Sequence, residues 1–248
     1  MSNLAAGKTY AFFETPLNKK IAVKLVEKSA IFFQFQPLET EKIALDIGEI
    51  ALLKNITEFD WLIFTDVLAV DYFLQKLTEN EIDFFGLDAV RVCAVGETVA
   101  DRLRFDQIHA DVIPNKTNAQ TVFSAISFYA GESNLKKLKL LLIKEKMSDF
   151  GIVNLLKEAN TELIELPVYT AKISDKSETI KLKTLLKNGA IDEFIFSAPE
   201  DLIALRHYFP DENELETIFE EVKASAIDAN VYQNLKENEI KAHYFIRQ

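Results

Sequence analysis

Two short segments of the chain carry almost the same sequence, and they constrain the fold more than any other feature. Residues 60–65 read Asp-Trp-Leu-Ile-Phe-Thr, and residues 192–197 read Asp-Glu-Phe-Ile-Phe-Ser. Each hydrophobic run is too short for a helix and precedes a helical pattern, so each predicts a buried strand that leads into a helix. Thr65 and Ser197 then lie at the turns, where a hydroxyl can cap the helix and free N–H groups can bind an anion. We therefore expect two similar lobes with ligand-binding corners.

Strand and helix patterns alternate along almost the whole chain, which predicts an α/β fold of parallel sheets covered by helices on both faces. The expected strands and extended runs are residues 10–13, 30–36, 60–65, 90–95, 108–113, 139–143, 161–170, 193–196, 221–225 and 241–246. The expected helices are residues 16–28, 67–77, 96–103, 119–129, 150–158, 180–186, 199–208 and 229–236. Ligands of such sheets bind beyond the carboxyl ends of the strands.

Composition excludes several classes of protein. With 248 residues and 48% hydrophobic content, the chain is long enough for one large core or two ordinary ones. The net charge of −11 argues against a general nucleic-acid role, because phosphate binding needs clustered Lys and Arg. A signal-like start and a run of 18 apolar residues are both missing, so we expect a cytoplasmic protein without a membrane segment. The single cysteine, Cys93, lies in a hydrophobic strand and is interpreted as core, not as a nucleophile.

Charged residues gather in two segments. Residues 211–221 are strongly acidic and are interpreted as solvated surface. Residues 136–139 are basic, and Lys144 and Lys146 continue this segment just past an expected strand. For these two lysines a role in ligand binding and a role as solvated surface both stay open.

Sequence motifs for cofactors are missing. The chain has no Gly-x-Gly-x-x-Gly, no Gly-Lys-Thr loop and no Gly-x-Ser-x-Gly. His109, His207 and His243 are far apart, and none has a metal-ligand neighbour at helical spacing. We therefore expect no metal and no cofactor, which leaves a cofactor-free enzyme or a binding protein. Any single corner could also be only a helix cap.

Four segments at these corners resemble the uroporphyrinogen-III synthase family. Residues 60–65 look like the family's strand ending in Phe-Thr-Ser, and residues 92–100 look like its strand leading into Gly-x-x-Thr-Ala. Residues 166–170 are similar to its Val-Tyr-x-Thr crossover, and residues 196–199 to its second Phe-Ser-x-Pro corner. No single motif is specific, but their order and spacing extend the resemblance over essentially the whole chain.

The resemblance implies two flavodoxin-like or Rossmann-like α/β lobes that face each other across a cleft. The first lobe would be discontinuous, formed by residues 1–36 and 171–248, with the second lobe, residues 37–170, inserted. Two extended crossover segments, residues 37–43 and 165–170, would join the lobes and run side by side.

The activity implied by the resemblance is that of a cyclising hydro-lyase of heme biosynthesis. It would convert hydroxymethylbilane, a linear tetrapyrrole polycarboxylate, to uroporphyrinogen III with inversion of ring D, as a monomer and without a cofactor. Tyr169 is the expected catalytic residue, a phenol that donates a hydrogen bond to the departing hydroxyl; a packed hinge aromatic is the alternative. The expected substrate-binding residues are Thr65, Asp66, Gly96, Glu97, Thr98, Lys144, Lys146, Ser197 and Ala198, with Thr65, Gly96 and Ser197 facing the cleft.

Several corners depart from the family pattern. Asp66 stands where the family has Ser, Val99 stands for a recurring Thr, and Asp228 and Val231 replace the Gly and Thr of the last corner. Losing Gly removes the closest backbone approach to a ligand, and losing Thr removes a donor. Two alternatives therefore stay open: a non-catalytic bilobal relative that binds a small molecule or regulates, and an unrelated two-lobed small-molecule sensor.

Overall fold

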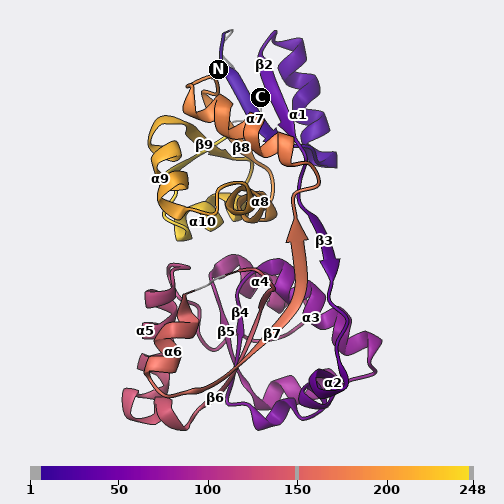
Figure 1. Ribbon diagram of the computed structural model, residues 1–248, viewed down its shortest axis with the longest axis vertical. Helices are drawn as coiled ribbons and strands as arrows, with labels where there is room; N and C mark the ends of the chain where they lie inside the picture. The colour runs from indigo at the N-terminus through magenta and orange to yellow at the C-terminus, as the bar shows by residue number, and fades with distance from the viewer. Residues whose placement is uncertain (1–6, 149–150, 246–248) are drawn as a thin grey trace. The chain divides into compact units, whose positions relative to one another are not determined.

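The computed structural model describes residues 7–148 and 151–245, and the chain divides into two compact units (Figure 1). Unit 1 combines Met1–Glu39 with Lys172–Gln248, and unit 2 is Thr40–Ala171. Each unit contains its own five-stranded sheet, which confirms the predicted two-lobed α/β fold. The lobe boundaries predicted after residues 36 and 170 stay predictions, because compactness alone does not show where a lobe ends.

Unit 1 is a parallel sheet with the strand order β10-β9-β8-β1-β2. Its strands are β1 (Thr9–Phe13), β2 (Ile31–Phe35), β8 (Glu193–Phe196), β9 (Lys223–Ala226) and β10 (Ala242–Tyr244). Its helices are α1 (Pro16–Glu27), α7 (Lys176–Lys187), α8 (Glu200–Tyr208), α9 (Glu212–Glu221) and α10 (Ala229–Glu237). Helix α1 begins where Pro16 follows the cap Thr15, a position at which the missing proline N–H is not needed.

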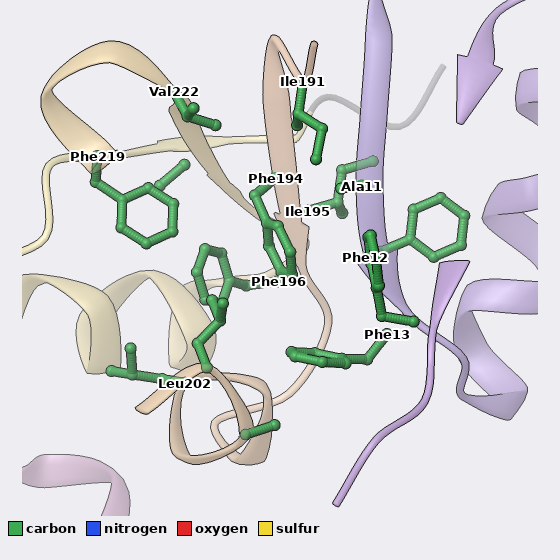
Figure 2. Packing of buried hydrophobic residues seen from close by; sticks show 14 of the residues in the cluster. Ala11, Phe12, Phe13, Ile191, Phe194, Ile195, Phe196, Leu202, Phe219 and Val222 are labelled. Atoms are coloured by element: carbon green, nitrogen blue, oxygen red, sulfur yellow. The ribbon is translucent and has the colours of Figure 1, made fainter. Parts of the chain in front are cut away.

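Aromatic side chains from neighbouring strands form the core of unit 1. Phe13 of β1 and Phe194 of β8 make an edge contact with ring centroids 5.6 Å apart, and Phe196 packs beside Phe194 (Figure 2). Phe219 of α9 closes this cluster from the helix layer. Burial on both faces explains why these strands are continuous hydrophobic runs instead of alternating ones.

Unit 2 contains the strand order β3-β7-β6-β4-β5. Its strands are β3 (Glu39–Lys42), β4 (Trp61–Phe64), β5 (Arg91–Ala94), β6 (Lys139–Glu145) and β7 (Glu162–Lys172). Its α-helices are α2 (Ile47–Lys54), α3 (Val67–Glu79), α4 (Glu97–Phe105), α5 (Ala119–Ala130) and α6 (Ile152–Glu158), and its 3₁₀ turns are η1 (Ile56–Glu58), η2 (Phe84–Ala89) and η3 (Glu132–Lys137). Strands β4, β5, β6 and β7 are parallel.

The two faces of the unit 2 sheet are covered by different helices. Trp61 and Ile63 of β4 pack in one cluster with buried residues of α5 and α6. Phe64 points to the other face and meets Phe73 of α3 edge-on, with ring centroids 5.2 Å apart. Cys93 is fully buried in the first cluster, and burial raises the pKa of its thiol, so its interpretation as core is confirmed.

The predicted pairing of the two crossover segments is confirmed. Strands β3 and β7 are neighbours in the sheet, and the Ile43 N–H donates to the Val168 carbonyl at 3.1 Å. Their arrows point in opposite directions (Figure 1). Most other predicted strands and helices are also found, with ends shifted by a few residues. Phe150 and Ile246, the outer ends of two predicted elements, lie outside the described residues.

The strand predicted at residues 108–113 is wrong. Only Val112 forms a bridge, to Cys93, at the far edge of the sheet. The carboxylate of Asp111 accepts the Val92 N–H at 2.8 Å and so replaces a main-chain partner, and Pro114 has no N–H to extend a ladder.

The sequence patterns missed two helices. Helix α2 begins with a capping box between Asp46 and Glu49 that is clear only once the helix is known. Helix α9 lies within the acidic segment that was interpreted as solvated surface. That interpretation is wrong for one side of the segment, because Leu215, Ile218 and Phe219 are buried in the core of unit 1.

Candidate functional site

The predicted residues Thr65, Asp66 and Tyr169 come together in unit 2. Asp66 is the N-cap of α3, where its Oδ1 accepts the Ala69 N–H at 2.8 Å and its Oδ2 accepts the Thr65 hydroxyl at 2.8 Å. The Tyr169 hydroxyl donates to Asp66 Oδ1 at 3.0 Å. Burial raises the pKa of the Asp66 carboxyl, although these three donors oppose the shift. The acid that caps α3 therefore also holds the phenol of Tyr169.

Tyr169 is packed on every side. Its ring is fully buried and stacks on Tyr72 of α3, with centroids 5.2 Å apart and an interplanar angle of 15°. Burial is the main cause that raises the pKa of the Tyr169 hydroxyl, followed by the charge of Asp66 and, further down, the charge of Glu145. The phenol is therefore fully protonated at neutral pH, and it is a hydrogen-bond donor.

The corner at Gly96 is built on a glycine, which has no side chain that could cap the helix after it. Gly96 has φ of 96°, a region that favours glycine, and α4 starts after it without a side-chain cap. Thr98, in the first turn, is 4% exposed, and its hydroxyl is buried without a hydrogen-bond partner among the described residues. The first-turn N–H groups of a helix attract anions, and an orphan hydroxyl beside them adds a donor.

The corner at Ser197 in unit 1 already holds a carboxylate of the chain itself. Asp201 Oδ2 accepts the Ser197 N–H at 2.6 Å, the Ser197 hydroxyl at 2.9 Å and the Ala198 N–H at 3.1 Å. Asn18 of α1 donates to the Ser197 hydroxyl oxygen at 2.8 Å, and its own Oδ1 has no partner among the described residues. Burial raises the pKa of Asp201 to about 6, although the donors from Ser197 and Ala198 oppose it.

The two predicted lysines have different surroundings. Lys144 is buried, and its Nζ lies 3.1 Å from Glu165 Oε2. The side chain of Lys146 is exposed. Lys144 therefore has a structural partner, whereas Lys146 is available to an anion.

Three corners of unit 2 end neighbouring strands. Thr65 follows β4 and Gly96 follows β5, while Lys146 follows β6, and these strands are adjacent and parallel. The carboxyl ends of parallel strands meet at one edge, so these predicted residues share the edge with Tyr169. Ser197 and Ala198 belong to unit 1. The prediction that they face one cleft with Thr65 and Gly96 stays a prediction.

Sequence reasoning missed three polar residues at these corners. Asp201 follows Ser197 by four residues, a spacing that hints at a local hydrogen bond. Asn18 and Glu145 gave no signal, because the contacts of Asn18 with Ser197 and of Glu145 with Ala171 join segments that are distant in the chain.

The described part of the chain contains no helix long and apolar enough to span a bilayer. Within the same residues, no three His, Cys, Asp or Glu side chains gather as they would around a metal ion.

Comparisons with known proteins point to the same family that the four corner segments resemble. Residues 19–246 match the family model described as uroporphyrinogen-III synthase HemD. A uroporphyrinogen-III synthase of Chlorobaculum parvum is 25% identical over 146 residues, which cover 58% of each chain. A porphyrin biosynthesis protein HemD of Ruminiclostridium josui is 21% identical over 145 residues, 58% of this chain and 28% of that protein. The matched region thus spans about three fifths of the Chlorobaculum parvum protein and about a quarter of the Ruminiclostridium josui protein.

The fold comparison covers nearly the whole chain. The crystal structure of wild-type uroporphyrinogen III synthase from the extremely thermophilic bacterium Thermus thermophilus matches with a TM-score of 0.66 and 17% identity, over 96% of this chain and 91% of that one. A second structure of the Thermus thermophilus protein matches with a TM-score of 0.65. At this identity the match concerns the fold alone.

We predict that Asp201→Asn changes how stability depends on pH. The folded-state pKa of about 6 lies above the ordinary value of 3.8, so the folded protein holds this proton more tightly than the unfolded chain. Protonation therefore stabilises the fold, and this contribution is lost as the pH rises from 3.8 to about 6. Between these limits the free energy of unfolding, measured in urea, should fall more in the wild type than in the variant. Carbon NMR should show an aspartate carboxyl that titrates near 6 and is missing from the variant; equal slopes in both proteins would contradict the prediction.

Proposed function

The chain belongs to the uroporphyrinogen-III synthase HemD family, and from this premise we propose that it cyclises hydroxymethylbilane to uroporphyrinogen III. Loss of hydroxyl from the hydroxymethyl group leaves an azafulvene cation, and the substituted carbon of ring D attacks its methylene carbon to give a spiro intermediate. Fragmentation and reclosure then invert ring D. Without a catalyst the chain closes uninverted to isomer I, so the protein has to hold one conformation of a flexible polyanion.

The observation that carries this proposal is the buried hydroxyl of Thr98 in the first turn of α4. Gly96, the N-cap residue, has no side chain to bond to this turn, and the buried Thr98 hydroxyl beside it has no partner among the described residues. Such a position suits an acetate or propionate carboxylate of the substrate, because main-chain N–H groups bind an anion without adding positive charge. This explains how a protein with a net charge of −11 can bind a polycarboxylate.

The other predicted residues take supporting roles in the proposal. Thr65 and Asp66 fix the start of α3, and Lys146 offers an exposed cation at the same edge. Glu97 contributes main chain at the Gly96 corner. At Ser197 and Ala198 a substrate carboxylate would have to displace Asp201, and at Lys144 it would have to compete with Glu165.

Tyr169 is the proposed donor to the departing hydroxyl. Its raised pKa keeps the phenol protonated, so it assists by a hydrogen bond and not by giving up its proton. Tyr169 donates to Asp66 in the structure, so this role requires its hydroxyl to exchange one acceptor for another. The proposal also includes a cytoplasmic monomer that acts without a cofactor.

The capped corners favour a second candidate, a non-catalytic relative that binds a small molecule. Asp66 and Asp228 each accept an N–H of the helix they precede. Asp201 occupies the corner at Ser197. Acids of the chain itself at three corners reduce the number of positions for substrate carboxylates.

The direct test of the proposal is product analysis. Hydroxymethylbilane generated in situ is incubated with the purified protein, without added metal or nucleotide, and isomers I and III are separated by chromatography. We expect isomer III in excess over the uncatalysed mixture. A product ratio equal to that of the protein-free reaction would favour the non-catalytic candidate.

Thr98→Val tests the role of the Thr98 hydroxyl at the Gly96 corner. Valine has a similar shape but no hydroxyl, and because Thr98 Oγ1 has no partner among the described residues, thermal stability should not fall. A hydrogen bond to a charged group contributes about 1.5–3 kcal/mol, so KM for hydroxymethylbilane should rise about tenfold or more. The matched control is Thr161→Val, whose buried hydroxyl donates to the Leu156 carbonyl at 2.7 Å. This control should lose stability and keep KM, and an unchanged KM in Thr98→Val would refute the role.

Tyr169→Phe tests the proposed donor, because it keeps the ring and its stack and deletes the hydroxyl. Assistance by one positioned acid typically contributes on the order of 10²-fold or more, so kcat for isomer III should fall by about this factor with the fold unchanged. Tyr72→Phe is the control, since it deletes the hydroxyl of the stacked partner, which lies 2.8 Å from Thr40 Oγ1. Wild-type turnover in Tyr169→Phe would leave Tyr169 as a packing residue.

A further inference from the structure

Glu145 is a buried glutamate whose carboxylate is only half satisfied. It ends β6, is 2% exposed, and its Oε1 accepts the Ala171 N–H at 3.2 Å. Its Oε2 is buried without a hydrogen-bond partner among the described residues. A carboxylate oxygen removed from water without a donor lowers the stability of the fold. An acid kept in this condition calls for a reason other than stability.

A bulge brings Glu145 beside Tyr169. Strands β6 and β7 pair residue by residue as far as Pro167, and the next pair is Glu145 with Tyr169, so Val168 is an extra residue in β7. In a strand without this bulge, side chains alternate between the faces, and Tyr169 would lie on the same face as Glu165. The extra residue instead turns Tyr169 to the α3 face, where it stacks on a ring of that helix. Pro167, the last residue paired before the bulge, has no N–H, so the interruption leaves no N–H of this residue unpaired.

The charges around Tyr169 are negative. Asp66 accepts a hydrogen bond from its hydroxyl, and the charge of Glu145 also acts on the phenol. Lys144, the residue before Glu145, does not neutralise this charge because it pairs with Glu165. Lys146, the residue after it, has an exposed side chain, so Glu145 lies just below the surface at the carboxyl edge of the sheet. A phenol between two acids suits a positively charged partner.

We propose that Glu145 is a further catalytic residue of the reaction proposed above, on which this inference rests: its free carboxylate oxygen accepts the N–H of the pyrrole ring that becomes cationic. The C–O bond of the hydroxymethyl group breaks, and the oxygen keeps the electron pair, takes one proton from solvent and leaves as water. The ring keeps a positive charge that its N–H shares. Tyr169 donates to the leaving oxygen while Glu145 accepts from the ring.

This arrangement stabilises the cation more than the substrate. The N–H of a neutral pyrrole is a modest donor, whereas the N–H of the azafulvene cation is charged and forms the stronger hydrogen bond with a carboxylate. A buried site strengthens the attraction further, because few water molecules screen it. An interaction that strengthens as charge develops raises kcat and changes KM little.

The test is Glu145→Gln in the full chain. The amide keeps the shape and an oxygen for the Ala171 N–H, and it removes only the charge. We expect kcat for isomer III to fall at least about tenfold, KM to change little and the melting temperature not to fall. Glu145→Asp, which restores the charge on a shorter side chain, should recover part of the rate.

The control is Glu193→Gln, which exchanges a buried glutamate of unit 1 whose Oε1 accepts from both Ser225 and Lys223. It should lower the melting temperature and leave kcat unchanged. The inference would be overturned if Glu145→Gln kept the wild-type kcat, melted at a lower temperature or failed to fold. In each of these cases, an excess of isomer III from the wild-type protein would still uphold the proposed function. A wild-type protein that forms no excess of isomer III would overturn both.

Discussion

The first-turn N–H groups of the helices are the constraint on which the arrangement of these corners depends. Each parallel strand that leads into a helix delivers such groups to the carboxyl edge of its sheet, and none of them has a partner within the helix. Asp66, Asp201 and Asp228 accept N–H groups at three corners, whereas the N-cap residue of α4 is Gly96, which has no side chain. At these corners the acids of the chain itself therefore take up main-chain N–H groups, whereas the N-cap glycine of α4 has no side chain with which to do so.

Burial weakens the acids that occupy these corners. Desolvation raises the pKa of Asp66 and Asp201, so each carboxyl is closer to its neutral form than an exposed aspartate is. Each acid still accepts N–H groups of its own corner, and an incoming carboxylate has to displace it. In the proposed function the occupied corners therefore bind a substrate carboxylate more weakly than the corner at Gly96 does.

The strands and most helices could be predicted from sequence because burial on both faces leaves unmistakable hydrophobic runs, as in residues 61–64 and 193–196. Helix α9 was missed since its acidic residues mask the spacing of Leu215, Ile218 and Phe219. The corner residues Thr65 and Gly96 were predicted because they follow such runs directly. Asn18 and Glu145 could not be predicted, because their contacts depend on strand order and on one extra residue in β7.

The extra residue in β7 links the fold to the chemistry of the corner. It turns Tyr169 to the face where Asp66 caps α3 and Glu145 ends β6. Two acids beside one phenol make proton release from that phenol unfavourable, so Tyr169 is a fixed donor and not a general acid that must be reprotonated. A donor of this kind assists by orientation, and the negative potential around it favours a cation. For a reaction whose difficulty is holding one conformation of a substrate through a cationic intermediate, orientation and fixed charge are the two contributions that a cofactor-free protein can supply.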